Sequence, residues 1–365
     1  MNTDFLKKIL KIPNYLCLPA AGIEVSNNSI KFIEFSNENR KLNIKNFGDV
    51  PLFSNIVKDG DILNKDVLVR TLADIKNKVS SDFIKVSIPE EKAYIFNVKM
   101  PKEAKTNLRE ALEFKIEENV PLKLAEVLFE YEIIENDKDS KEMLINVSVI
   151  PKTVISTYTE IFNQAGFFPV AFEVESKMVA SAVIPKDDMK NSVIINIKDD
   201  STLFIGVMGG HVRVTFSVPI GENTIKNNLL KNKIFENEAE VNNFFESDFS
   251  FEINCKKDLY SSLVNIFSIL KDEVEKFNTY IVDKFPEKIK TSNKVIDDII
   301  LCGKSSILPG LARHINQNIN TEVKLANTWV NVFDAKENVS KINFNDSLGF
   351  VTAVGLVVSS RKENA

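Results

Sequence analysis

The chain has 365 residues, of which 44% are hydrophobic and 27% are charged, as in a soluble globular protein. This length exceeds what one hydrophobic core usually holds, so we expect two lobes or several subdomains. The net charge of −5 argues against a nucleic-acid partner, and the three cysteines lack the spacing of a zinc site or a disulfide framework.

The first predicted element is a short amphipathic helix within the N-terminal segment 1–20, and Pro13 ends it. Apolar residues fall on one face of the stretch Asp4 to Ile12 and lysines on the other. Such a helix can lie on an anionic membrane or in a partner's groove, but short terminal helices more often pack on their own domain. We expect no secretory leader, because Pro13 and Asn14 interrupt any apolar core.

A strand, a polar turn and a return strand follow between Gly22 and Phe35. Glu24 precedes the turn Ser26-Asn27-Asn28-Ser29, whose residue types favour a tight hairpin. The turn has a size that suits a phosphate, although this stretch taken alone favours an ordinary hairpin. Helical spacing over Asn64 to Lys78 and a buried strand over Asp82 to Pro89 complete an α/β layer.

Residues 90–170 are predicted to form a small α+β unit. Its elements are a strand ended by Pro101, an amphipathic helix Lys102 to Val120, strands Leu128 to Ile134 and Met143 to Ile150, and a helix Thr153 to Ala165. Gly166 suits the C-cap of the last helix.

The rest of the chain is predicted to form a second lobe. Its elements are strands Ser192 to Ile197, Thr202 to Met208, His211 to Pro219 and Lys294 to Cys302, a Phe-rich helical region 226–256, and a long helix Asp258 to Lys284. We interpret the phenylalanines as core-covering residues, not as a recognition surface. The apolar run Leu348 to Val358 is too short to cross a bilayer.

Taken in order, several short motifs resemble one known family. They are Gly22-Ile23-Glu24-Val25, Leu108 to Pro121 followed by Phe129-Glu130-Tyr131-Glu132, Ala165-Gly166-Phe167, Ile300-Leu301-Cys302-Gly303 and Gly349 to Val358. Each motif is weak alone, but the ordered set, over about residues 20–358, resembles the PilM family. These are actin-like type IV pilus assembly proteins related to the division protein FtsA.

The resemblance implies an α/β fold of the actin-like ATPase type, with two lobes and an SHS2-like subdomain 1C inserted in the first. Subdomain 1A would comprise 21–89, 171–190 and 335–360, and subdomain 1C would comprise 90–170. The second lobe, IIA and IIB, would comprise 191–334.

The resemblance also implies ATP and Mg²⁺ as cofactors, bound between the lobes. The matching positions are Gly22, Glu24, Ser26, Asn27 and Asn28 in the first hairpin, Asn196, Lys198, Ser201 and Thr202 in the second, and Gly303, Lys304 and Ser305 in the adenosine-binding turn. Glu24 would reach the metal through a water molecule.

The chain departs from the family pattern at four of these positions. Glu24 and Asn196 stand where the family has aspartate, Lys198 replaces a glycine, and Lys304 follows a single glycine instead of a pair or triplet. The loss of a carboxylate at Asn196 weakens a magnesium site. We therefore expect ATP hydrolysis to be absent or very slow, assign no catalytic residue, and leave ATP binding open.

Glu173 and Glu175 are candidates for polar contacts at the junction of the lobes. Glu175 heads a predicted helix that continues through Val183. The alternative is a charge pair at a helix N-terminus, which the helix dipole favours.

The leading functional hypothesis is a cytoplasmic scaffold, peripheral at the inner face of the cytoplasmic membrane. The resemblance implies that it binds the N-terminal peptide of a PilN-like protein in a 1A/1C groove, together with other proteins of the pilus assembly platform; self-association stays open. One alternative is an FtsA-like division protein, but the C-terminus lacks that family's amphipathic helix. The other alternative is a sugar-kinase-like phosphotransferase. Asn196 and Lys198 argue against it, because they stand where such an enzyme needs a carboxylate and a glycine.

Overall fold

The computed structural model describes residues 20–38, 41–53, 55–135, 141–246, 256–285, 296–317, 319, 321–333 and 340–359. The predicted N-terminal helix and the phenylalanines at 249 and 251 lie outside these ranges. Within the described residues, no helix is both long enough and apolar enough to cross a membrane.

The first lobe is built on a five-stranded sheet in the order β10-β6-β1-β2-β3. The strands are β1 (Ala21–Val25), β2 (Ser29–Glu38), β3 (Lys41–Pro51), β6 (Phe83–Ile88) and β10 (Phe168–Val174). β1 pairs antiparallel with β2 and parallel with β6, which confirms the predicted hairpin and return strand. Every residue of β1 is buried, because helices cover both faces of the sheet at this point.

The helices on one face are α2 (Lys65–Lys76) and α4 (Lys152–Gln164), which share a core with β1, β2 and β6. The short strands β4 (Val57–Lys58) and β5 (Asp61–Ile62) form a separate pair beside them. α2 begins after Asn64, whose side chain accepts a hydrogen bond from the Val67 N–H, as expected of an N-cap. Thus both predicted helices exist with nearly the predicted bounds.

The second lobe repeats this plan with a sheet in the order β13-β12-β11-β14-β15. The strands are β11 (Ser192–Ile197), β12 (Thr202–Met208), β13 (His211–Val218), β14 (Asp298–Cys302) and β15 (Glu322–Leu325). Helices α6 (Glu222–Lys231), α7 (Glu238–Glu246), α8 (Lys256–Lys284) and α9 (Leu311–Asn316) cover one face. Phe235, Phe244 and Phe245 are buried in that core, which confirms their structural interpretation.

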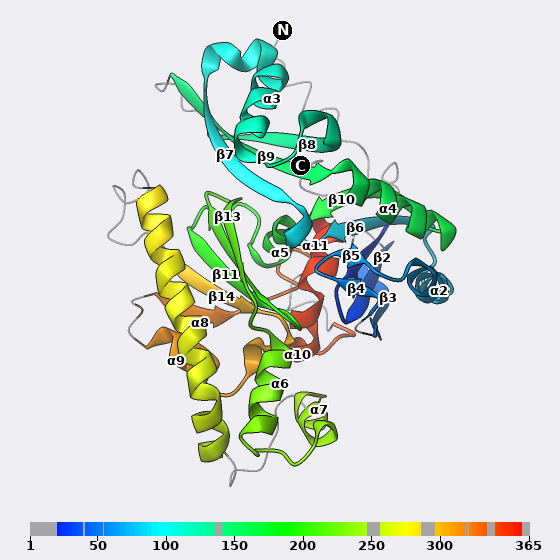
Figure 1. The fold of residues 1–365 in the computed structure, drawn as a ribbon, viewed down its shortest axis with the longest axis vertical. Coiled ribbons are helices and arrows are strands. Elements are labelled where there is room, and N and C mark those ends of the chain that lie inside the picture. Colours follow the sequence, from blue (N-terminus) through cyan, green and yellow to red (C-terminus); the bar gives the residue numbers. More distant parts are fainter. Residues whose placement is uncertain are drawn as a thin grey trace.

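Two helices lie between the sheets and join the lobes: α5 (Glu175–Val183) and α11 (Val351–Ser359) (Figure 1). One hydrophobic cluster contains side chains from both helices and from both sheets, including Ile33 and Ile194. The short helix α10 (Phe344–Ser347) precedes α11, and the 3-10 turn η7 (Lys304–Ile307) follows β14. The lobes therefore meet through packed helices as well as through the hairpin turns described below.

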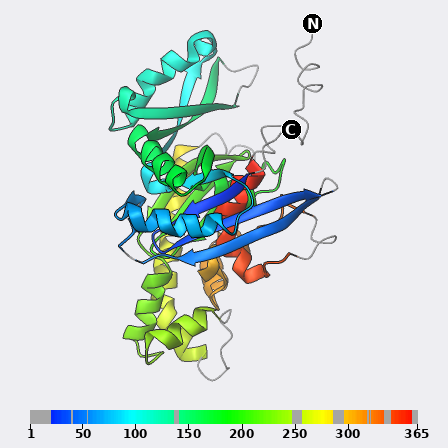
Figure 2. The same ribbon diagram turned by 90° about the vertical axis from the view of Figure 1, so that its right-hand side faces the viewer.

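A third sheet, in the order β7-β9-β8, stands on the first lobe. Its strands are β7 (Tyr94–Pro101), β8 (Val127–Glu135) and β9 (Glu142–Pro151), and α3 (Leu108–Asn119) packs on it. This unit and the helices α6 and α7 lie at opposite ends of the molecule (Figures 1 and 2).

Two sequence predictions need correction here. The helix predicted from Lys102 starts as a 3-10 helix, Lys102–Asn107, and becomes α-helical only at Leu108. The helix α4, predicted as part of the small α+β unit, buries Tyr158, Ile161 and Phe162 against the first-lobe sheet.

Candidate functional site

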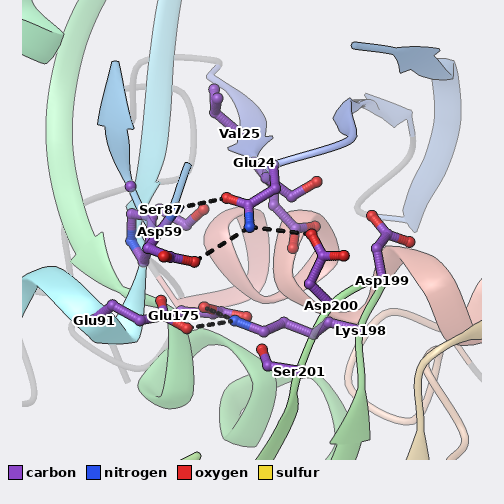
Figure 3. A pocket seen from close by; sticks show the side chains of 14 residues that line it. Glu24, Val25, Asp59, Ser87, Glu91, Glu175, Lys198, Asp199, Asp200 and Ser201 are labelled. Carbon is purple, nitrogen blue, oxygen red and sulfur yellow. Dashed lines mark hydrogen bonds and ion pairs between the residues drawn. The ribbon is translucent and has the colours of Figure 1, made fainter. Parts of the chain in front are cut away.

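The turns of the two lobes' first hairpins meet at Asp200 (Figure 3). Asn27 and Asn28, in the β1–β2 turn, donate their side-chain amides to Asp200 Oδ2 at 3.2 and 3.3 Å. Asn223, at the start of α6, donates to the other oxygen, Oδ1, at 2.8 Å. Asn27 is fixed further by the Asp59 N–H, which donates to its side-chain oxygen at 2.7 Å. The amides predicted to hold phosphate therefore bind a carboxylate of the opposite lobe.

Lys198, in the same β11–β12 turn, reaches across to two glutamates of the first lobe. Its Nζ lies 3.0 Å from Glu175 Oε2 and 3.5 Å from Glu91 Oε1. Burial alone would lower the pKa of Lys198. The carboxylates of Glu175 and Glu91 outweigh this effect and raise the pKa above its ordinary value. The ammonium is thus firmly charged and held at the lobe junction.

Glu175 is the first residue of α5 and is 4% exposed. Its Oε2 also accepts the backbone N–H of Glu90 at 3.3 Å, while the Ser176 N–H donates to Glu90 Oε2 at 3.2 Å. Burial raises the pKa of Glu90. Glu175 therefore lies where it contacts the second lobe through Lys198, whereas Glu173 lines a groove described below.

A hollow of only about 40 Å³ lies beside Lys198, lined by Asn27, Asp59, Glu175 and Ser201 among others. A much larger cavity, about 710 Å³, opens on the other side of Glu24 and Lys198. The larger volume is within the range of sites for small organic ligands, roughly 300–1,000 Å³. Of the predicted residues, those lining this cavity are Glu24, Ser26, Asn28, Asn196, Lys198, Gly303 and Lys304.

Glu24 and Lys31 stand opposite each other on β1 and β2 and form the charged wall of the cavity. Burial raises the pKa of Glu24 to about 7, and its Oε2 has no hydrogen-bond partner in the described part of the chain. Burial opposes the charge on Lys31, but Glu24 and Asp199 raise its pKa above the ordinary value. Sequence reasoning overlooked Lys31, although the hairpin register pairs it with Glu24.

Helix α6 supplies a second pair that the sequence analysis overlooked. Glu222 and Lys226 lie one turn apart and form an ion pair of 2.8 Å on the cavity wall. Ser305, predicted to bind nucleotide, is fully buried and donates to Glu222 Oε2 at 2.6 Å. Its place is behind the wall, where it orients Glu222.

Three other predicted residues serve packing. A Cβ at Gly22 would lie 2.3 Å from the carbonyl oxygen of Ala353, so this glycine permits the close approach of α11. Gly303 has φ +86°, and a Cβ there would lie 2.0 Å from the Ile197 carbonyl oxygen. Thr202 is fully buried and donates to the Ile220 carbonyl at 2.6 Å.

The residues present fit a nucleotide better than they fit Mg²⁺. The cavity offers Lys31, Lys226 and Lys304 to an anion. At the lobe junction, however, an amide stands at position 196 and an ammonium lies among the carboxylates. Within the described ranges, no three His, Cys, Asp or Glu side chains are close enough together to hold a metal ion. We therefore derive no step through a metal.

A second concave feature lies between the small sheet and the first lobe. This groove, of about 370 Å³, is lined by β8, β9, α4, β10 and α5. Leu128 and Val170 are 49% and 45% exposed on its walls, and Phe172 and Glu173 also line it. Burial lowers the pKa of Lys177 in this groove, against the influence of Glu132 and Glu173.

Comparison with solved structures places the chain among actin-like folds. It is similar to a PilM-PilN type IV pilus biogenesis complex, with TM-score 0.75, 15% identity, and 94% of this chain and 98% of that chain covered. For EutJ, an ethanolamine utilization protein of Carboxydothermus hydrogenoformans, the TM-score is 0.52 and the identity 11%, with 98% of this chain and 99% of that chain covered. For MreB5 of Spiroplasma citri bound to ADP, the TM-score is 0.52 and the identity 11%, with 94% of this chain and 97% of that chain covered.

No curated protein sequence matches the chain significantly. The family model described as type IV pilus assembly protein PilM matches residues 22–249, more than half of the chain. With the two-lobed actin-like fold and the interlobe cleft in place, the chain belongs to the PilM family of type IV pilus assembly proteins.

Proposed function

We propose that this protein is a scaffold of the pilus assembly platform that binds the N-terminal cytoplasmic peptide of a PilN-like membrane protein. The peptide lies in the groove between the proposed subdomains 1A and 1C. The observation that carries the proposal is this groove, which has apolar walls and a strand edge on each side. A solved complex of PilM with PilN, whose PilM fold this chain shares, supports the choice of partner.

Two outer strands border the groove. β10 is the outer strand of the first-lobe sheet, and β8 is the outer strand of the three-stranded sheet. Each outer strand offers backbone groups that an extended peptide can pair with, while apolar pockets beside it select side chains. Leu128 on β8 and Val170 on β10 provide such apolar contacts. The geometry therefore suits main-chain recognition of an extended segment.

The proposal places the protein at the inner face of the cytoplasmic membrane through its partner. A membrane-anchored protein with a short cytoplasmic N-terminus would present the peptide there. Other platform proteins and further copies of the chain are then brought to the same place.

The interlobe cavity, in this proposal, takes an adenine nucleotide that adjusts the lobes and is not rapidly hydrolysed. Its volume of about 710 Å³ and its lysines support this ligand. MreB5 of similar fold has been solved with ADP. Slow or absent hydrolysis is supported by Asn196 and by Lys198, which is engaged with Glu175.

The peptide proposal is tested by fluorescence anisotropy with a labelled peptide of the partner's N-terminal segment. Val170→Glu puts a charge on the apolar wall and should weaken binding at least ~10-fold, which corresponds to ~1.4 kcal/mol. Met189→Glu is the matched control, because Met189 is 68% exposed and lies outside the groove lining. Equal weakening by both variants, or by neither, would contradict binding in this groove.

A further inference from the structure

The side chain of Lys198 occupies an unusual position for a lysine. It extends from the β11–β12 turn of one lobe into a set of carboxylates of the other lobe. Glu175 and Glu91 contact its ammonium directly, and Glu24 lies close enough to raise its pKa further. An ammonium is therefore the positive charge at the centre of the interlobe junction (Figure 3).

The carboxylates of Glu24 and Glu175 each have a buried oxygen that could bind a cation. Glu24 is 8% exposed and Glu175 is 4% exposed. Glu24 Oε2 and Glu175 Oε1 have no hydrogen-bond partner within the described residues, and both side chains line the small hollow beside Lys198. Carboxylate oxygens of this kind are the ligands that Mg²⁺ and Mn²⁺ prefer.

We propose that the ammonium of Lys198 takes the place of a divalent cation at the lobe junction, so that the protein's own side chain pairs with Glu175 and Glu91 and offsets part of the negative charge there. A divalent ion is thereby excluded from the cleft. The family resemblance implies Mg²⁺ at this junction, whereas this chain places the ammonium of Lys198 there.

The same turn also supplies an anion. Asp200, two residues after Lys198, accepts the side-chain amides of Asn27 and Asn28. The turn therefore carries a positive and a negative group that each bind the first lobe. Together they hold the two lobes in contact without an external metal ion or phosphate.

An ordinary interlobe ion pair is the competing explanation, and it makes a different prediction. Removal of the ammonium leaves the buried carboxylates of Glu24 and Glu175 without a compensating charge, which is strongly unfavourable. If Glu175 and Glu24 form a cation position, a divalent ion held by these two carboxylates and by water should then enter, since the described residues bring no third such ligand together. If they form only an ion pair, they should take up protons and no metal should bind.

The experiment measures Mn²⁺ binding to the full chain by electron paramagnetic resonance, with the metal alone as the probe. The variants are Lys198→Met, which keeps the length and removes the charge, and Lys198→Arg, which keeps the charge. We expect no Mn²⁺ at the junction in the wild type or in Lys198→Arg. Lys198→Met should bind one equivalent, with an affinity at least ~10-fold above any residual Mn²⁺ binding by the wild type.

A second substitution identifies the position of the ion. Glu175→Gln in the Lys198→Met background should abolish the gained binding. One equivalent bound by the wild type and lost in Glu175→Gln would overturn the proposal, as would a folded Lys198→Met that gains no Mn²⁺. The wild-type measurement does not depend on whether Lys198→Met folds. The test uses neither peptide nor nucleotide, so its result is independent of the proposed function.

Discussion

Single residues in the cleft are determined as much by backbone packing as by ligand chemistry. Gly303 illustrates this, because it was assigned to an adenosine-binding turn on resemblance alone. Its φ of +86° lies in the region that L side chains rarely adopt, and its N–H donates to the Leu348 carbonyl at 2.9 Å. The glycine thus permits the close approach of η7 to β11 at the cavity wall.

Gly303→Ala should destabilise the protein by ~2–4 kcal/mol, because the new Cβ meets the Ile197 backbone and the positive φ is strained. Thermal unfolding followed by circular dichroism measures the loss. Gly349→Ala is the matched control, since the nearest atom to its Cβ is 3.8 Å away and no positive φ is involved. Similar melting temperatures for both variants would refute the packing role of Gly303.

At the scale of elements, the β1–β2 and β11–β12 hairpins position the charges of the cleft. The register that pairs Glu24 with Lys31 puts an acid and a base side by side on the cavity wall. Helix α6 adds Glu222 and Lys226 from the second lobe. The cleft therefore presents cations to an anionic ligand from both lobes.

Lys31→Gln should weaken ADP binding ~10-fold, because it removes a partly buried positive charge from the cavity wall. Lys58→Gln, an exposed lysine outside the cavity lining, should leave the affinity unchanged. Isothermal titration calorimetry should also give the same ADP affinity in Mg²⁺ and in EDTA, since Lys198 supplies the cation. An affinity that requires Mg²⁺ would contradict this account of the cleft.

Much of the element pattern was predictable from the sequence, for identifiable reasons. The apolar spacing of α8 and α2 is strictly helical, and the predicted helix from Glu175 to Val183 has the observed bounds of α5. The start of α3 was missed, because a stretch that shares helical spacing can still form a 3-10 turn after Pro101.

Contacts between distant segments could not be predicted in the same way. Gly22 contacts α11 near Ala353, and Lys198 contacts Glu91 and Glu175, yet no local pattern links these positions. The functions of Lys31 and Asp200 likewise depend on how two hairpins meet in space. Periodicity fixes which face of an element is buried, but it does not say which distant element covers it.

At the scale of the whole molecule, the two lobes share one plan and are joined at two levels. Helices α5 and α11 connect them through a common core, and the hairpin turns connect them through polar contacts. The small sheet contacts the second lobe as well, because Asn97 and Asn146 donate to backbone carbonyls of β13. On its other side, β8 and β10 border the groove on the first lobe. Glu175, at the lobe junction, and Lys177, on the groove wall, therefore both belong to the first turn of α5.

The central claim is that an extended peptide binds between β8 and β10. Hydrogen exchange of the full chain, with and without the partner's N-terminal peptide, tests it most directly. The account predicts slower exchange in Val127–Glu135 and Phe168–Val174 when the peptide is bound, with little change around Lys198. Protection confined to the interlobe cavity, or no protection of either strand at saturating peptide, would contradict it.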